Sequence, residues 1–166
     1  MDFFKKLGQS RLYWSAMVLT ALAYEGIALY YQYALNEYPC VLCIHIRIWV
    51  LAFVLVGLLG LVLRPRKSGL ILTTLLSLIA SVGLLERSWQ TLATERLWIE
   101  GSCSLQSGLP SWFALDIWFP AVFEVQASCG YTPEILFGIT MAEALIFSSV
   151  FALGVTSLIS IALFRK

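Results

Sequence analysis

Four long apolar stretches, separated by more polar segments, dominate the pattern along the chain. They cover residues of about 12–32, 43–63, 69–89 and 139–164. A helix rises 1.5 Å per residue, so about 20 apolar residues cross the ~30 Å hydrocarbon core of a bilayer. Each stretch is expected to be a helix, because an open strand leaves its backbone polar groups without partners in lipid. The pattern predicts an all-α integral membrane four-helix bundle, a single membrane domain over residues 1–166.

Two polar connections of unequal length, residues 33–42 and 90–138, are expected on the same side of the membrane. The longer one contains an aromatic stretch at 112–120 that is too short to span. Aromatic rings are favoured at the membrane interface, so a short interfacial helix is expected there, with packing on the bundle as the alternative. The Thr-Pro-Glu sequence at 132–134 combines an N-cap, a proline and an acid. This pattern favours a fourth helix that begins outside the hydrocarbon.

The placement of charge gives the expected orientation. Hydrophobic residues make up 60% of the chain and charged residues only 13%, and the net charge is +1. Most basic residues flank the spans at one end: Lys5, Lys6, Arg11, Arg64, Arg66, Lys67, Arg165 and Lys166. The positive-inside rule then predicts that both termini are cytoplasmic and that both polar connections lie outside. The length of the first apolar stretch and its Glu25 favour a retained span over a cleaved signal peptide. The sequence shows no nucleic-acid-binding patch.

A Cys-x-x-Cys motif lies at the outer mouth of the second span. Cys40 and Cys43 are three residues apart and therefore share one helical face. Arg47 lies on that face one turn deeper. Its charge and the helix N-terminus both favour thiolate, the reactive form of cysteine. The alternative for Arg47 is a side chain that extends to the interface without a chemical role.

A second cysteine pair, Cys103 and Cys129, lies in the long outer connection. Taken alone, the pair is best interpreted as a static brace, worth about 3 kcal/mol in the chain-entropy model. The neighbouring Cys-x-x-Cys favours thiol–disulfide exchange instead, which needs cysteines close together. A zinc site is a further alternative, although the second close pair usual in such sites is missing. Two pairs in one compartment indicate a relay from a soluble partner to a lipid-soluble acceptor, for which a quinone is chemically plausible.

Two other polar residues in or near the spans have alternative interpretations. Glu25 lies past the middle of the first span, where a buried acid must be protonated or paired. A hydrogen bond inside the bundle is its favoured interpretation, and proton handling during quinone reduction is the alternative. His45 is two residues from Cys43 and is expected to point away from the cysteine face.

Over almost its whole length the sequence resembles the DsbB family of bacterial quinone-linked disulfide bond formation proteins. The resemblance implies a four-helix bundle in the bacterial inner membrane, with cytoplasmic termini and periplasmic redox cysteines. It implies a protein-dithiol:quinone oxidoreductase that reoxidises a DsbA-like thioredoxin-fold oxidase and reduces ubiquinone or menaquinone. The matching segments are Pro-Cys-Val-Leu-Cys at 39–43 with Arg47, Leu-Ala-Tyr-Glu at 22–25, Ala-Leu-Tyr-Tyr-Gln at 28–32, residues 115–123, Cys103 and Cys129.

The resemblance also implies a role for each candidate site residue. Cys103 forms the mixed disulfide with the partner. Cys129 is its pair, and it switches to a bond with Cys40 while the partner is engaged. Cys43 is the thiolate that faces the quinone in a charge-transfer contact, and Arg47 stabilises it.

One departure and two competing functions accompany this interpretation. Ile46 stands where family members often carry Glu or Gln before the arginine. A membrane scaffold with loop-bracing disulfides is the alternative from another functional class. An enzyme like vitamin K epoxide reductase would use similar chemistry, but the cysteine arrangement fits it less well.

Overall fold

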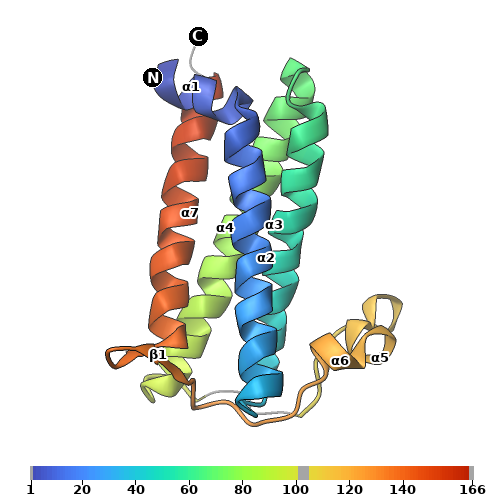
Figure 1. Cartoon of the computed structure of the whole chain (residues 1–166), viewed down its shortest axis with the longest axis vertical. Helices are drawn as coiled ribbons and strands as arrows, with labels where there is room; N and C mark the ends of the chain where they lie inside the picture. Colours follow the sequence, from blue (N-terminus) through green and yellow to red (C-terminus); the bar gives the residue numbers. More distant parts are fainter. Residues whose placement is uncertain (1, 101–104, 165–166) are drawn as a thin grey trace.

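Four long helices run side by side in the computed structural model, which describes residues 2–100 and 105–164 (Figure 1). Each is long and apolar enough to cross a membrane, which confirms the predicted all-α four-helix architecture. The third long helix continues past its predicted end at residue 89. The four are α2 (Arg11–Ala34), α3 (Val41–Leu63), α4 (Lys67–Glu95) and α7 (Met141–Phe164).

The two ends of the bundle carry different parts of the chain (Figure 1). At one end, here named the terminal end, lie α1, the end of α7 and the turn between α3 and α4. At the other, the cysteine end, lie the 35–40 connection and the long segment between α4 and α7. The shorter elements are α1 (Asp2–Gln9), the 3-10 turn η1 (Ser111–Phe113), α5 (Leu115–Trp118), α6 (Pro120–Phe123), β1 (Glu134–Leu136) and β2 (Ile139–Thr140).

Close contact between α2 and α3 depends on glycine. A Cβ atom at Gly60 would overlap the ring of Trp14, and one at Gly57 would lie 2.6 Å from Val18 Cγ2. Small residues let helix backbones approach closely, which supplies the van der Waals contact that drives association in lipid. Trp14 is fully buried and donates its indole N–H to Gly8 O at 2.9 Å. The same side chain therefore fixes both the α2–α3 contact and the position of α1.

A line of buried hydroxyl groups runs along α4 where it packs on α7. Thr73, Ser77 and Ser81 each donate to the carbonyl oxygen four residues earlier, at 2.8–2.9 Å. These hydrogen bonds within the helix offset the cost of burying the hydroxyl groups in an apolar environment. Ser81 Oγ also lies 3.2 Å from Thr156 Oγ1 of α7. The small side chains bring the two helices together, and the Ser81–Thr156 hydrogen bond joins them within their buried interface.

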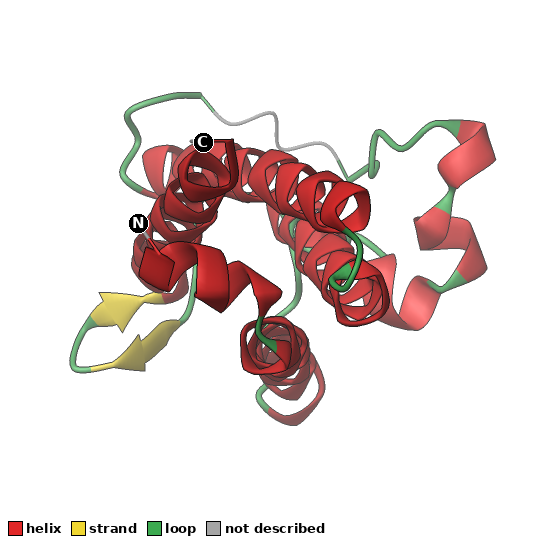
Figure 2. Ribbon diagram, turned by 90° about the horizontal axis from the view of Figure 1, so that it is seen from above, coloured by secondary structure: helices red, strands yellow, loops and turns green. Residues whose placement is uncertain are grey.

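The segment 111–123, here named the arm, stands beside the bundle at the cysteine end, on the opposite side from the β-hairpin (Figures 1 and 2). One short helix was predicted at 112–120, and the structure has η1, α5 and α6 instead. The breaks fall at Ala114 and Phe119, whose ψ angles of 67° and 64° are not helical. Phe119 precedes a proline, which disfavours the helical conformation. Trp112 and Ile117 are 77% and 75% exposed.

The predicted helix start at 132–134 is wrong, because this segment leads into a β-hairpin. Strand β1 pairs antiparallel with β2, and α7 begins only at Met141. Phe137 and Gly138 form the turn with φ angles of 52° and 79°. Two consecutive positive φ angles are typical of the type I′ turn that joins two-residue hairpins. Thr132 donates its hydroxyl to Glu95 at the end of α4 instead of capping a helix, so a tertiary contact overrides the local signal.

Candidate active site

Cys40 is the N-cap of α3, and this position brings the two motif sulfurs together. Its backbone is extended, with φ −84° and ψ 171°, and its Sγ accepts the Cys43 N–H at 3.4 Å. An N-cap side chain turns back over the first helical turn in this way. The two sulfur atoms lie 2.9 Å apart as free thiols. Cys43 lies in the first turn of α3, where unpaired N–H groups create a partial positive charge.

Cys129 contacts Cys40 from a distant part of the sequence. It packs against Cys40, Val41 and Leu42, and its thiol is hydrogen-bonded to that of Cys40. The preceding segment is held by Pro39 O, which accepts the N–H groups of residues 126 and 127 at 3.0 and 3.2 Å. Cys40 therefore contacts two other thiols at once. Cys103 lies outside the described residues.

The contacts among these thiols determine which of them keep their protons. The hydrogen bond with Cys129 lowers the pKa of Cys40, but its contact with Cys43 and its burial outweigh this and raise the pKa to about 12. The hydrogen bond with Cys40, together with burial, raises the pKa of Cys129. Both groups are therefore protonated thiols near neutral pH, and each must release a proton when it forms a disulfide.

Arg47 is fixed by neutral acceptors and does not extend to the interface. Its side chain is 5% exposed. One guanidinium nitrogen donates to Gln32 Oε1 at 2.7 Å and to Val122 O of the arm at 2.6 Å, and the other donates to Ala28 O at 3.3 Å. Among the described residues it forms no ion pair with a carboxylate. Its positive charge is thus held rigidly and left uncompensated beside Cys43.

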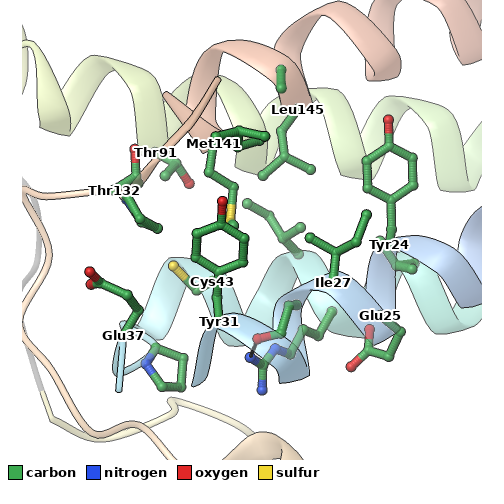
Figure 3. Close-up of a pocket in the computed structure, with 18 of the residues that line it drawn as sticks. Tyr24, Glu25, Ile27, Tyr31, Glu37, Cys43, Thr91, Thr132, Met141 and Leu145 are labelled. Carbon is green, nitrogen blue, oxygen red and sulfur yellow. Dashed lines mark hydrogen bonds between the residues drawn. The ribbon is translucent and has the colours of Figure 1, made fainter. Parts of the chain in front are cut away.

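A cavity of about 140 Å³ opens at the cysteine end of the bundle. Cys43 and Arg47 line it from α3, and Met141 and Leu145 line it from α7 on the opposite wall (Figure 3). One water molecule needs only about 10–15 Å³ on this measure, so a ring-sized molecule has room. The other lining residues are mainly apolar or aromatic: Tyr24, Ile27, Ala28, Tyr31, Tyr38, Pro39, Ile46, Val50, Tyr131, Pro133, Ile135 and Ala144, with Glu25, Glu37, Thr91 and Thr132 as polar members.

This cavity has the chemistry needed for a flat apolar ring that carries polar oxygens. Apolar walls favour the ring, because burying its surface removes it from water. The Arg47 guanidinium favours any negative charge that develops on an oxygen, and in a desolvated site such a charge is stabilised more than in water. The Cys43 sulfur is placed to meet the ring. The residues present therefore fit a quinone headgroup.

Three features of the site were not predicted from the sequence, and the expected environment of Glu25 is wrong. The acceptors of Arg47, Gln32 and Val122, were not predicted, nor was the place of Ile46 in the cavity wall. The polar signal of Gln32 in an apolar span could have been used, whereas Val122 acts through its backbone. Both Glu25 carboxyl oxygens are buried without a hydrogen-bond partner among the described residues, so its expected bond inside the bundle is not found.

His45 is directed away from the cavity, toward the long connection. Its Nε2 lies 2.8 Å from Ser107 O, and Ser107 donates its hydroxyl to Asp116 at 2.6 Å. Through Ser107, these contacts attach α5 of the arm to α3. Within residues 2–100 and 105–164, no group of three or more His, Cys, Asp or Glu side chains is arranged to hold a metal ion.

Comparisons with known proteins agree on one family. The family described as "Disulfide bond formation protein DsbB" matches residues 10–159. Disulfide bond formation protein B 2 of Pseudomonas aeruginosa is 39% identical over 136 residues, covering 80% of each chain. Disulfide bond formation protein B of Photorhabdus laumondii is 35% identical over 130 residues, covering 78% of this chain and 76% of the relative. The protein of that name from Histophilus somni is 30% identical over 167 residues, covering 99% and 93%.

Proposed function

Because the chain belongs to the DsbB family of disulfide bond formation proteins, we propose that it is a protein-dithiol:quinone oxidoreductase. It reoxidises a DsbA-like thioredoxin-fold partner in the periplasm and passes the electrons to ubiquinone or menaquinone. One observation carries this proposal: Cys43 and Arg47 line the same apolar cavity, while Cys40 contacts both Cys43 and Cys129. Sulfur can thus pass electrons from the outer connection to the cavity wall.

The sulfur relay begins at the long connection and ends at Cys43. A partner thiolate attacks Cys103 of a Cys103–Cys129 disulfide, which forms a mixed disulfide and releases Cys129. Cys129 then attacks Cys40 of a Cys40–Cys43 disulfide, and Cys43 leaves as a thiolate. The contact between Cys129 and Cys40 supports this exchange, since attack requires the two sulfurs to meet. The leaving thiolate forms in the first turn of α3, near the uncompensated guanidinium of Arg47. The second thiolate of the partner then displaces Cys103 and leaves in the disulfide of the oxidised partner. The freed Cys103 attacks Cys129, which restores the Cys103–Cys129 disulfide, and Cys40 leaves, takes up a proton and becomes a thiol beside the Cys43 thiolate.

The chain's residues bind and orient the electron acceptor. Quinone, when bound, accepts two electrons and two protons. Arg47 and Cys43 would hold its headgroup, and the α2 and α7 side chains of the cavity would exclude water from it. The Arg47 guanidinium is already fixed by its three acceptors, so little reorganisation is needed as negative charge develops.

This multi-pass membrane protein is proposed to lie in the bacterial inner membrane with both termini in the cytoplasm. The basic residues of α1, of the start of α2 and of the α3–α4 turn belong to the terminal end, which supports this orientation (Figure 1). The cysteine end then faces the periplasm, where thiols are oxidised. The exposed Trp112 and Ile117 of the arm suit contact with the outer membrane interface.

The proposal is tested with purified protein in detergent, a short-chain ubiquinone analogue and a reduced thioredoxin-fold partner. Quinone absorbance and partner thiols are followed together. Cys43→Ser is expected to abolish quinone reduction, and Cys103→Ser to abolish partner oxidation while the Cys40–Cys43 pair still reacts with quinone. Glu86→Gln, at a half-exposed carboxyl outside the cavity, is the control and should behave as wild type. Full turnover in Cys43→Ser contradicts the proposal.

The same preparation separates the relay from a membrane scaffold. Bracing disulfides resist mild reductants, whereas exchanging disulfides are labile and are reduced by the partner. Thiol labelling after incubation with the reduced partner should therefore detect newly accessible cysteines. Labelling that is unchanged by the partner favours the scaffold.

A further inference from the structure

Glu25 is a buried acid that the sulfur relay does not use. Its side chain is 9% exposed, and neither carboxyl oxygen has a hydrogen-bond partner among the described residues. It lines the same cavity as Cys43 and Arg47. In Figure 3 Glu25 lies on α2, on the other side of the view from Cys43, with further lining residues between the two.

The surroundings of Glu25 favour a neutral carboxylic acid. Burying an unpaired carboxylate in an apolar medium is so costly that the group takes up a proton instead. No ion pair within the described part of the chain offsets this cost, because Arg47 donates to Gln32, Val122 and Ala28 rather than to Glu25. The acid therefore stores a proton at the cavity wall without a partner to hold it.

Quinone reduction by a Cys40–Cys43 dithiol needs a proton that the two cysteines do not supply. Formation of the disulfide releases two electrons, but with Cys43 already a thiolate only Cys40 contributes a proton. The quinol requires two protons, so one more must come from another group. This requirement for a second proton donor rests on the proposed function.

We propose that Glu25 is the acid that delivers this second proton. As the Cys40–Cys43 bond forms, its electron pair goes to quinone, Cys40 gives up its thiol proton and Glu25 gives up its carboxyl proton. The thiolate charge that disappears from Cys43 reappears on Glu25, so protons, electrons and net charge balance. A solvent proton restores the acid before the next turnover.

Arg47 is placed to stabilise the negative charge both on Cys43 and on Glu25. Its acceptors Ala28 and Gln32 lie three and seven residues after Glu25, on the same face of α2. The guanidinium therefore lies about one turn from the carboxyl group and acts on it electrostatically. The same cation faces Cys43 before the reaction and the Glu25 carboxylate after it, so its charge is compensated in both states.

The other proton-bearing groups of the cavity are less suited to this role. A tyrosine phenol is a weaker acid than a carboxyl group, with an ordinary pKa near 10 against about 4.3. Tyr31 also donates its hydroxyl to Glu134 O at 3.4 Å. Glu37 also lines the cavity, but it belongs to the connection between α2 and α3 and is only partly buried. Glu25 is the buried acid among the lining residues that the structure describes.

The first test measures the stored proton in protein free of quinone. Infrared spectroscopy detects the C=O stretch of a protonated carboxyl group and its shift in deuterated water. Wild type and Glu86→Gln are expected to show this band at neutral pH, and Glu25→Gln is expected to lose it. Absence of the band in wild type, or its persistence in Glu25→Gln, overturns the proposal.

The second test measures proton delivery during a single turnover of the reduced protein with a ubiquinone analogue. Glu25→Gln keeps the shape of the side chain but has no acidic proton. It is expected to slow quinol formation by about 100-fold, the low end of the general-acid contribution, while the quinone concentration that gives half the maximal single-turnover rate stays unchanged. Glu25→Asp should restore part of the rate and its dependence on deuterated water. A wild-type rate in Glu25→Gln, or an equal loss in Glu25→Asp, refutes the role.

Failure of this proposal is distinguishable from failure of the proposed function. If wild type does not reduce quinone at all, the oxidoreductase proposal fails, whatever the infrared band shows. If wild type reduces quinone and Glu25→Gln does so equally fast, the relay stands and only the assignment of Glu25 is wrong. Thermal unfolding of each variant identifies losses that come from misfolding, and Glu25→Asp provides the second variant in that case.

Discussion

Removing the charge of Arg47 is expected to change the reduction potential of the Cys40–Cys43 pair. In the proposed mechanism the reduced pair carries a Cys43 thiolate, which the guanidinium stabilises, whereas the disulfide is neutral. Residues four apart on a helix lie about 6 Å apart, and at an effective dielectric constant of about 20 this attraction is worth about 2.8 kcal/mol. For a two-electron couple, 2.8 kcal/mol corresponds to about 60 mV. Arg47→Met is therefore expected to make the pair more reducing by up to about 60 mV.

The measurement is a redox titration of purified protein in thiol–disulfide buffers, with thiol labelling to count reduced Cys40 and Cys43. Arg47→Lys keeps the charge but loses the fork that reaches Gln32, Val122 and Ala28, so its potential should stay near that of wild type. Arg87→Met is the matched control, because Arg87 pairs with Glu86 and Gln90 on α4. An unchanged potential in Arg47→Met would refute the electrostatic role of this arginine.

Three further predictions concern packing, protonation and the hairpin. Gly60→Ala should lower the unfolding free energy by about 1–3 kcal/mol, and with it the thermal unfolding midpoint, because the added Cβ overlaps Trp14. The control Gly26→Ala should leave the midpoint unchanged, because its Cβ meets nothing within 4 Å. Because the pKa of Cys40 is raised to about 12, its alkylation should be slow at about pH 8 and still accelerate at higher pH. The stability this shift contributes is present below the unfolded pKa of about 8.5 and is lost as pH rises through 12. Gly138→Ala, at φ 79°, should cost about 1–2 kcal/mol in unfolding free energy and, measured by hydrogen exchange, loosen the hairpin.

The four long helices, and the closeness of Cys43 to Arg47 in the second span, could be predicted from the sequence because both depend on local periodicity. Apolar length determines where a helix can cross lipid, and residue spacing determines that Cys43 and Arg47 share a face. The meeting of Cys40 with Cys129 depends instead on how the outer connection returns to α3. Pro39 O fixes that return through backbone bonds, which leave no pattern in the sequence.

The hairpin forms where two local signals in the sequence compete. Thr132 and Pro133 carry a genuine helix-start signal, but the Thr132 hydroxyl is used by Glu95 of α4. The Phe137–Gly138 pair between apolar residues is a competing hairpin signal. The hydrogen bond from Met141 N–H to Pro133 O closes the hairpin, so the hairpin forms instead of a helix. Competing local signals are resolved here by contacts between elements, which a single sequence does not display.

The hydrogen bond from Arg47 to Val122 O makes the arm part of the cavity's electrostatics. Any protein that binds at the cysteine end and draws α6 outward removes one of the guanidinium's acceptors. The guanidinium then keeps Gln32 and Ala28 as acceptors and has one N–H available to a molecule in the cavity, so docking at this surface would change the binding of that molecule. Substrate engagement and oxidant binding would in this way be thermodynamically linked through a single side chain.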